Sequence, residues 1–183
     1  MQNAAQKPPT KIYPVSRALG LRKNMSEPQF TLINPNDPKM QKAYDKTSDT
    51  ISDFVDAVEL GGHELYLAKL RFRDPDLSEE TGKDQFLYLW LSEVYWHRDE
   101  DMLSGVFFEV PEGLEKWHKV GDRLGFDPED VFDWMIQHKG RMWGGHTIRV
   151  TRENIESHEG KKQYDKYIGV SSYETSLPVG QYT

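Results

Sequence analysis

The clearest helical pattern in the chain runs from Asn36 to Gly62. Apolar side chains recur there at spacings of three and four residues, which places them on one face of a helix. Asp37 followed by Pro38 is typical of a helix start, and Gly61 is typical of a helix end. We therefore predict one amphipathic helix that packs on a sheet through Met40, Ala43, Tyr44, Thr47, Ile51, Phe54, Val55 and Val58.

Shorter apolar stretches follow, and they predict β-strands. The longest is apolar on both faces, as expected of a central strand that is covered on both sides. The strands are predicted at residues 63–73, 85–96, 103–110 and 123–126, with a closing hairpin at 132–138 and 141–150. The fold class that follows is α+β, a strongly bent antiparallel sheet of about five strands with one amphipathic N-terminal helix packed on it.

Two charged stretches between the strands, residues 74–84 and 97–102, are predicted to be loops. Beyond Thr151 the chain is polar, with a helix expected around residues 153–166. We divide the chain into a basic flexible N-terminal arm at residues 1–28, a single α+β domain at 29–160 and a polar C-terminal extension at 161–183.

Charge is distributed unevenly over the 183 residues, whose formal net charge is −7. Residues 1–23 carry +5, and the rest, with 18 basic and 30 acidic residues, carries −12. A body with this charge does not bind nucleic acid phosphates directly, but it attracts a basic protein partner and speeds their encounter. The alternative is that the acidity only keeps the protein soluble.

The composition also excludes several kinds of catalytic and binding site. The chain has no cysteine, which excludes disulfides, thiolate catalysis and Cys-based zinc sites and is consistent with a reducing compartment. No phosphate-cradling glycine loop, nucleophile elbow or paired-histidine helix motif is present, so we expect no cofactor and no metal. No stretch is apolar enough to cross a membrane, and we expect a cytoplasmic protein with no membrane partner.

Several uncommon residues lie at fixed offsets between residues 66 and 150. They are Trp90-Leu91, Gly105, Pro111, Gly121-Asp122, Asp133-Trp134, Gly140, Gly144-Gly145, Thr147 and Arg149. In this order and spacing, the segment resembles the YegJ-like family of bacterial domains of unknown function. Two positions depart from the family pattern: Leu87-Tyr88 stand where an acidic residue and a histidine are common, and Glu109 stands in place of Asn. These departures favour a binding surface over shared catalysis.

Asp133, beside Trp134, is the strongest candidate for a catalytic residue. A carboxylate held against an indole has a raised pKa, which suits acid or base catalysis. In the structural interpretation, which we favour, the carboxylate accepts hydrogen bonds from backbone N–H groups of a turn and the indole fills the core. Gly144-Gly145 is then expected to form a bulge that bends the last strand.

Two hypotheses about function follow. The first is a non-enzymatic protein-binding module, most concretely an immunity-type inhibitor that neutralises a cognate bacterial toxin by occluding its active cleft. Its acidic residues pair with basic groups of the partner while tryptophans serve as apolar anchors. This predicted partner-binding set comprises Asp74, Asp76, Glu79, Glu80, Trp96, Asp99, Glu100, Asp101 and Trp143.

The second hypothesis is a small enzyme or ligand-binding domain that uses a groove near the closing hairpin. Its candidate residues are Asp133, His138, His146 and Arg149. In this hypothesis His138 and His146 face each other across the hairpin and form a metal site with Asp133. The interpretation that we favour is that both are solvated or turn histidines.

Overall fold

In the computed structural model, which describes residues 37–177, helix α1 (Pro38–Leu60) begins and ends where the sequence predicts. The Asp37 carboxylate accepts a hydrogen bond from the Lys39 N–H at 2.8 Å, and Gly61 takes a positive φ of 72°. The predicted apolar face is the buried one, with Met40, Ala43, Thr47, Phe54 and Val58 all buried. The predicted basic arm, residues 1–28, lies outside the described residues.

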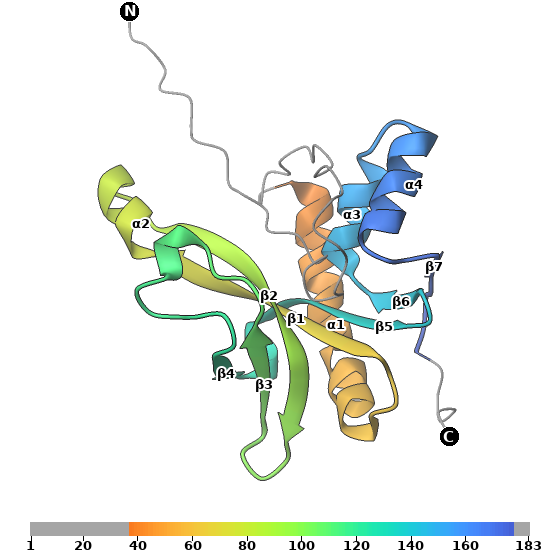
Figure 1. The fold of residues 1–183 in the computed structure, drawn as a ribbon, viewed down its shortest axis with the longest axis horizontal. Helices are drawn as coiled ribbons and strands as arrows, with labels where there is room; N and C mark the ends of the chain where they lie inside the picture. The colour runs from red at the N-terminus through yellow and green to blue at the C-terminus, as the bar shows by residue number, and fades with distance from the viewer. Residues whose placement is uncertain (1–36, 178–183) are drawn as a thin grey trace, which may run out of the picture.

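One open sheet of seven strands forms the centre of the fold, in the order β4-β3-β2-β1-β5-β6-β7 (Figure 1). The strands are β1 (Leu65–Asp74), β2 (Gln85–His97), β3 (Met102–Phe107), β4 (Arg123–Phe126), β5 (Val131–His138), β6 (Arg141–Gly144) and β7 (Ser172–Tyr173). Neighbours are antiparallel except for β6 and β7, which are parallel. The α+β class is confirmed, whereas the expected count of about five strands and the expected strong bend are wrong.

Besides α1, residues 37–177 contain three further α-helices and two short 3-10 turns. One of these helices lies where a polar helix is expected, around residues 153–166, and the other two are not predicted. The three helices are α2 (Pro75–Thr81), α3 (His146–Glu153) and α4 (His158–Tyr167), with the turns η2 (Glu112–Leu114) and η3 (Pro128–Asp130). Helix α2 replaces the expected acidic loop. It forms because the Asp74 carboxylate accepts a hydrogen bond from the Leu77 N–H at 2.9 Å, and Pro75 suits the first helical position.

Two buried clusters hold the layers together. The first lies between α1 and one face of the sheet and contains Phe54, Leu89, Leu91 and Trp134. The second lies on the opposite face, under α3 and α4 (Figure 1), and is formed by Leu67, Trp90, Met135, Met142, Ile148, Tyr164, Tyr167, Ile168 and Val170. The packed core therefore continues past residue 160, where we placed the domain boundary.

The last predicted strand, residues 141–150, is divided in two by Gly144-Gly145. Gly144 and Gly145 have φ values of +66° and +59°, which end β6 and start α3. A side chain at Gly144 would meet the Trp134 carbonyl oxygen at 2.3 Å, so glycine is required by space as well as by conformation. The expected bulge within one strand is thus a strand-to-helix junction.

A β-bulge in β2 changes which residues share a face. Glu93 adopts a φ of +50°, and the pairing of β2 with β3 shifts between Ser92 and Tyr95. The alternation of side chains therefore shifts beyond Ser92, because the extra residue moves the following side chains to the other face. Val94 and Trp96 consequently pack in the first cluster with Leu89 and Leu91, rather than on the face of Trp90.

Candidate functional site

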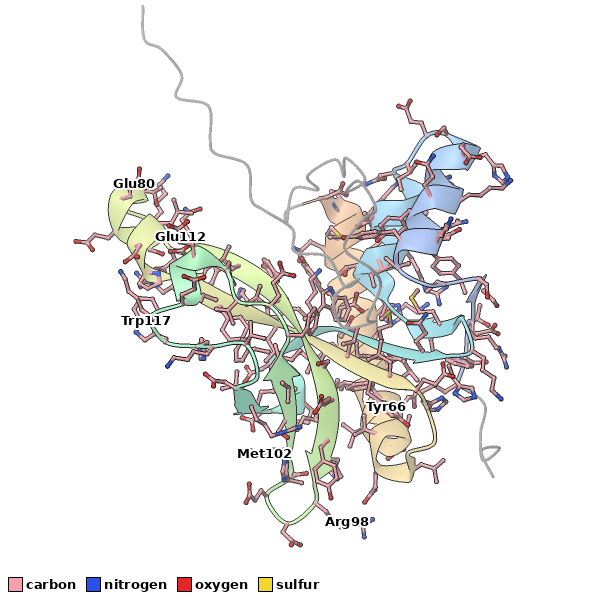
Figure 2. The ribbon with its side chains drawn as sticks, in the orientation of Figure 1. Tyr66, Glu80, Arg98, Met102, Glu112 and Trp117 are labelled. Atoms are coloured by element: carbon pink, nitrogen blue, oxygen red, sulfur yellow. The ribbon has the colours of Figure 1, made fainter. Side chains whose placement is uncertain are left out.

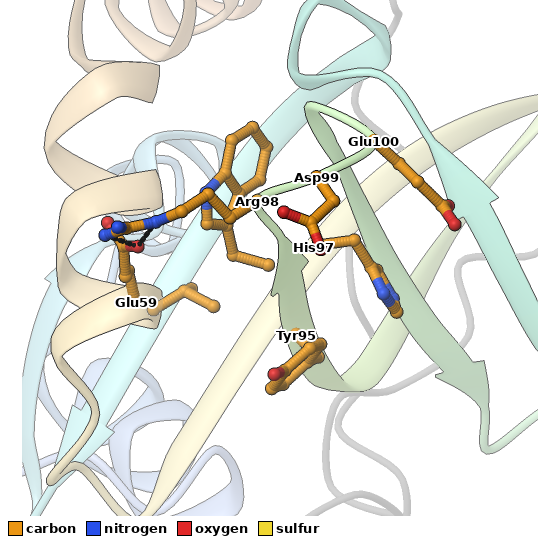
Figure 3. A pocket seen from close by; sticks show the side chains of 8 residues that line it. Glu59, Tyr95, His97, Arg98, Asp99 and Glu100 are labelled. Atoms are coloured by element: carbon orange, nitrogen blue, oxygen red, sulfur yellow. Dashed lines mark hydrogen bonds and ion pairs between the residues drawn. The ribbon is translucent and has the colours of Figure 1, made fainter.

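A groove of about 380 Å³ lies between the end of α1 and the hairpin that joins β2 to β3 (Figure 3). We call it the hairpin groove; it is lined by Val58 and Glu59 of α1 and by residues 95–100. Tyr95 is 61 % exposed, and Trp96 is half-buried against the first cluster. The groove therefore combines a half-buried aromatic side chain with an exposed one.

One ion pair holds the hairpin to α1. Arg98 Nε donates to Glu59 Oε1 at 2.6 Å, and Figure 3 shows the Arg98 side chain reaching toward Glu59 while Glu100 points away from it. The Arg98 side chain is largely exposed, so the pair adds little to the free energy of unfolding. The pair links the hairpin to the end of the helix at one side of the groove.

The tip of the hairpin is acidic. We call residues 99–101 the acidic tip: Asp99, Glu100 and Asp101 are all exposed, and among residues 37–177 none of their carboxylates forms an ion pair. The turn is closed by the Glu100 N–H, which donates to the His97 carbonyl at 3.1 Å, and Asp101 takes a φ of +52°. Three carboxylates are thus displayed on an ordered turn beside the groove.

The other acidic residues of the predicted partner-binding set lie elsewhere. Figure 2 shows Glu80, on α2, and Arg98, on the hairpin, at well-separated ends of the sheet. Asp76 pairs with Lys116 at 2.7 Å, and Glu79 and Glu80 are exposed on the same helix. Asp74 is buried, and its carboxylate caps α2, so it is not available to a partner. The expected single acidic surface is therefore two separate ones.

The predicted tryptophan anchors also differ from each other. Trp143 is only 1 % exposed, because it belongs to the first cluster and its Nε1 donates to the Ser176 carbonyl at 3.0 Å. It cannot contact a partner without opening the core, so its assignment as an exposed anchor is wrong. Tyr95, which the predicted set omits, is exposed at the groove instead. Trp117 is exposed as well but lies near α2 (Figure 2).

Asp133 is completely buried, and its carboxylate accepts three hydrogen bonds. The His146 N–H donates to Oδ1 at 2.9 Å, while the Thr147 N–H and Oγ1 donate to Oδ2 at 2.8 and 2.6 Å. The carboxylate therefore caps the first turn of α3, where a negative charge also interacts favourably with the helix dipole. This is the structural role we favoured, although the group that it caps is a helix rather than a turn.

Lys69 extends this cluster across the sheet. Its Nζ donates to Thr147 Oγ1 at 3.0 Å, and Lys69 stands opposite Asp133 in the pairing of β1 with β5. Burial lowers the pKa of Lys69, and the charge of Asp133 opposes that shift. We call Lys69, Asp133 and Thr147 the buried polar cluster; it joins β1, β5 and α3.

The four residues of the second hypothesis do not form one site. His146 packs edge-on against Trp134, with Nε2 at 3.4 Å from Thr50 Oγ1, and burial lowers its pKa. Arg149 donates to the carbonyls of Gly144 and Glu174 at 2.8 and 2.6 Å. Both line a crevice of about 70 Å³ that includes neither Asp133 nor His138.

His138 lies at the far end of β5, where it pairs with Arg141 and its ring contacts His63 at 5.8 Å between centroids. It therefore does not face His146. The backbone N–H of His146 donates to Asp133, which lies five residues before His138 on β5. Within residues 37–177, no group of three side chains of the types that bind metals gathers in one place.

The uncommon residues that carry the family resemblance, from Trp90 to Arg149, are called the motif residues here. Those not yet described also have structural roles. Trp90 and Trp134 are buried in the two clusters, and Asp122 accepts the Lys119 N–H at 2.8 Å. Gly121 and Gly140 have φ values of +94° and +74°, as their turns require. The uncommon residues that define the motif thus position helices, strands and turns.

The fold is that of an α+β domain in which these motif residues have structural roles. The chain belongs to the family of uncharacterized proteins conserved in bacteria (DUF2314), whose model matches residues 37–171. Searches of curated proteins and of solved structures found no match. Among the described residues, no helix combines the length and apolar character needed to span a bilayer.

Proposed function

We propose that this protein is a protein-binding module that docks a basic partner through the hairpin groove and the acidic tip. The observation that carries the proposal is that exposed Tyr95 and the carboxylates of Asp99 and Glu100 lie together on one ordered hairpin, next to a groove of about 380 Å³. Aromatic anchors surrounded by polar residues are typical of the energetic centres of interfaces.

Electrostatics favour a basic occupant. The described part of the chain is acidic, and the acidic tip adds three carboxylates that are not neutralised by neighbouring cations. Such a surface steers a positively charged partner toward the groove and speeds association, more so at low salt. The aromatic side chains then supply the apolar contact that charge alone does not give.

In its most concrete form, the proposal is an immunity-type inhibitor within a YegJ-like group, which occludes the active cleft of a cognate toxin. The small size and acidity of the chain support this form, as does the structural use of its motif residues. The alternative site at Asp133, His138, His146 and Arg149 is not favoured, because these side chains point to different contacts.

The test is a parallel capture experiment with three versions of the full chain. The wild type, the tip variant Asp99→Lys/Glu100→Lys and the control Glu156→Lys/Glu159→Lys are each immobilised and exposed to a bacterial lysate from the source of the sequence. The tip variant and the control change net charge equally, and Glu156 and Glu159 are exposed next to and within α4, away from the hairpin. Asp101 is left unchanged because its positive φ suits Asp better than Lys.

We expect a basic protein that the wild type and the control retain and the tip variant loses. A partner retained equally by all three versions would contradict the assignment of the interface. A partner that is itself acidic, or the absence of any partner lost by the tip variant, would contradict the proposed function.

A further inference from the structure

The sheet carries a second pocket beside the hairpin groove, on the part formed by β2, β3 and β4. It has a volume of about 430 Å³ and is lined by residues 93–95, His97, Ser104 and Arg123. Tyr95 and His97 line both this pocket and the hairpin groove. The pocket is shallow and open to solvent, and Ser104 is only 3 % exposed within it.

Ser104 is the centre of a hydrogen-bonded group in this pocket. His97 Nε2 lies 2.8 Å from Ser104 Oγ, and Arg123 Nη1 lies 3.0 Å from the same atom. The strand pairing explains the arrangement, because Ser104 stands opposite Tyr95 on β2 and Gly125 on β4. His97 and Arg123 are then its diagonal neighbours on one face of the sheet.

Donor chemistry determines the direction of one of these two hydrogen bonds, and the tautomer of His97 determines the other. Arginine can only donate, so Ser104 Oγ accepts the hydrogen bond from Arg123. Because a hydroxyl oxygen has two lone pairs, the direction of the second bond is set by the His97 tautomer. In the tautomer that carries hydrogen on Nδ1, the Ser104 hydroxyl donates to His97 Nε2, and this is the tautomer that the proposal requires. A hydroxyl that donates to an imidazole is the arrangement by which a serine is activated as a nucleophile.

Neighbouring groups hold both partners of Ser104. The Tyr95 ring packs edge-on against His97, with 5.0 Å between centroids. Arg123 Nη1 also donates to the Glu93 carbonyl at 3.0 Å, and its Nη2 lies 3.5 Å from the Glu93 carboxylate. The bulge at Glu93 therefore fixes the guanidinium beside the hydroxyl.

We propose that Ser104 is a nucleophile toward small activated esters, with His97 as its general base and Arg123 as the cation beside the reacting atoms. Ser104 Oγ bonds to the carbonyl carbon as its proton passes to His97 Nε2. The bond from that carbon to the alkoxy oxygen then breaks, and Nε2 returns the proton to the leaving oxygen. The products are an acyl ester of Ser104 and a free alcohol, and attack by water in a second round releases the carboxylic acid.

The first test uses a fluorophosphonate probe on the full chain, with intact mass and peptide mapping as the readout. Nucleophilic attack on phosphorus displaces fluoride and leaves a covalent adduct on the serine. We expect one adduct, on Ser104, that is absent from Ser104→Ala and formed at least ~10-fold more slowly by His97→Gln, since removing a general base costs about that much or more. Ser92→Ala is the matched control, because Ser92 is a buried serine of the same strand pair whose hydroxyl donates to the Val106 carbonyl.

The absence of an adduct on Ser104, or an adduct whose rate does not depend on His97, would overturn the proposal. Circular dichroism and the melting temperature of each variant separate loss of reactivity from loss of folding. Partner capture by the wild type is measured separately, so this proposal and the proposed function can fail independently.

A second test remains informative if the alanine variant folds poorly. Because the chain has no cysteine, Ser104→Cys introduces a single thiol whose alkylation by iodoacetamide can be followed against pH. We expect an apparent thiol pKa below the ordinary value of about 8.5, and a return toward it when His97→Gln is added. An ordinary thiol pKa that is unchanged by His97→Gln would also overturn the proposal.

Discussion

The buried polar cluster and the hairpin groove use charged side chains in opposite ways. In the cluster, Asp133 is completely enclosed and every contact of its carboxylate is to α3. At the groove, Asp99 and Glu100 are exposed on an ordered turn. A carboxylate whose hydrogen bonds are all made within the protein stabilises the fold, whereas one left exposed beside an aromatic side chain is available to a partner. The motif residues therefore belong to the scaffold, and the binding surface that we propose lies outside the motif.

The largest loss of stability is expected from a substitution at the junction between β6 and α3. Gly144→Ala places a Cβ at 2.3 Å from the Trp134 carbonyl oxygen in a backbone with a φ of +66°. We expect the free energy of unfolding to fall by about 4 kcal/mol, measured by urea denaturation. Gly121→Ala is the matched control, since its φ is +94° but nothing lies within 4 Å of the added Cβ. Equal losses for the two variants would show that the contact with Trp134 contributes nothing.

The second largest loss of stability is expected from a substitution in the buried polar cluster. Asp133→Ala leaves the N–H groups of His146 and Thr147 without their acceptor and Lys69 without its nearby opposite charge. We expect a loss of about 3 kcal/mol in the free energy of unfolding. The exposed Asp130, changed in the same way, serves as the control. A loss below about 1 kcal/mol for Asp133→Ala would contradict the role of the cluster.

The pH dependence of stability tests the surroundings of Asp133 without changing Asp133 itself, and its expected effect is smaller. Burial lowers the pKa of His146 below 6.5, against a smaller opposing effect of Asp133. Between the folded pKa and 6.5 the unfolded chain binds more protons than the folded chain, so stability falls as the pH is lowered through 6.5. His63, whose pKa is lowered by burial and by His138, contributes in the same direction.

We therefore expect the melting temperature to fall between pH 7.5 and pH 5.5, and His146→Gln to reduce that fall. His158→Gln is the control, because His158 is exposed at the start of α4. If the two variants show the same pH dependence as the wild type, His146 is not the group that titrates.

The smallest expected effect on stability is at the acidic tip. Asp99→Lys/Glu100→Lys changes two exposed side chains outside any ion pair among the described residues. We expect the free energy of unfolding to change by less than about 0.5 kcal/mol, as measured by urea denaturation. A loss comparable to that of Asp133→Ala would show that the hairpin is part of the scaffold after all.

The difference between local and long-range contacts explains which parts of the fold and of the candidate site the sequence could predict. Helix α1 was placed correctly because its signals are local: Asp37 caps it, Pro38 begins it and Gly61 ends it. The structural role of Asp133 was predicted as well, since a buried carboxylate beside a turn usually accepts backbone hydrogen bonds. Local capping and periodicity were enough in both places.

The rest depends on contacts between distant residues. Helix α3 was mistaken for a strand because the left-handed Gly144 is set by packing on Trp134, which no local pattern reveals. The shift of faces in β2 follows from the bulge at Glu93, a residue type that rarely adopts a positive φ. The sequence does not predict the hairpin groove, although it selects Trp96 and the acidic tip, because the groove forms where Arg98 meets Glu59 across 39 residues of chain.

The most direct test of the central claim is hydrogen exchange of the full chain with and without the captured partner. If the hairpin groove is the interface, partner binding slows exchange in peptides that cover residues 92–102 and the end of α1. Peptides that cover α2 and the junction at residues 144–152 should exchange at unchanged rates. Protection confined to residues 144–152 or to α2, with none at the hairpin, would contradict the account.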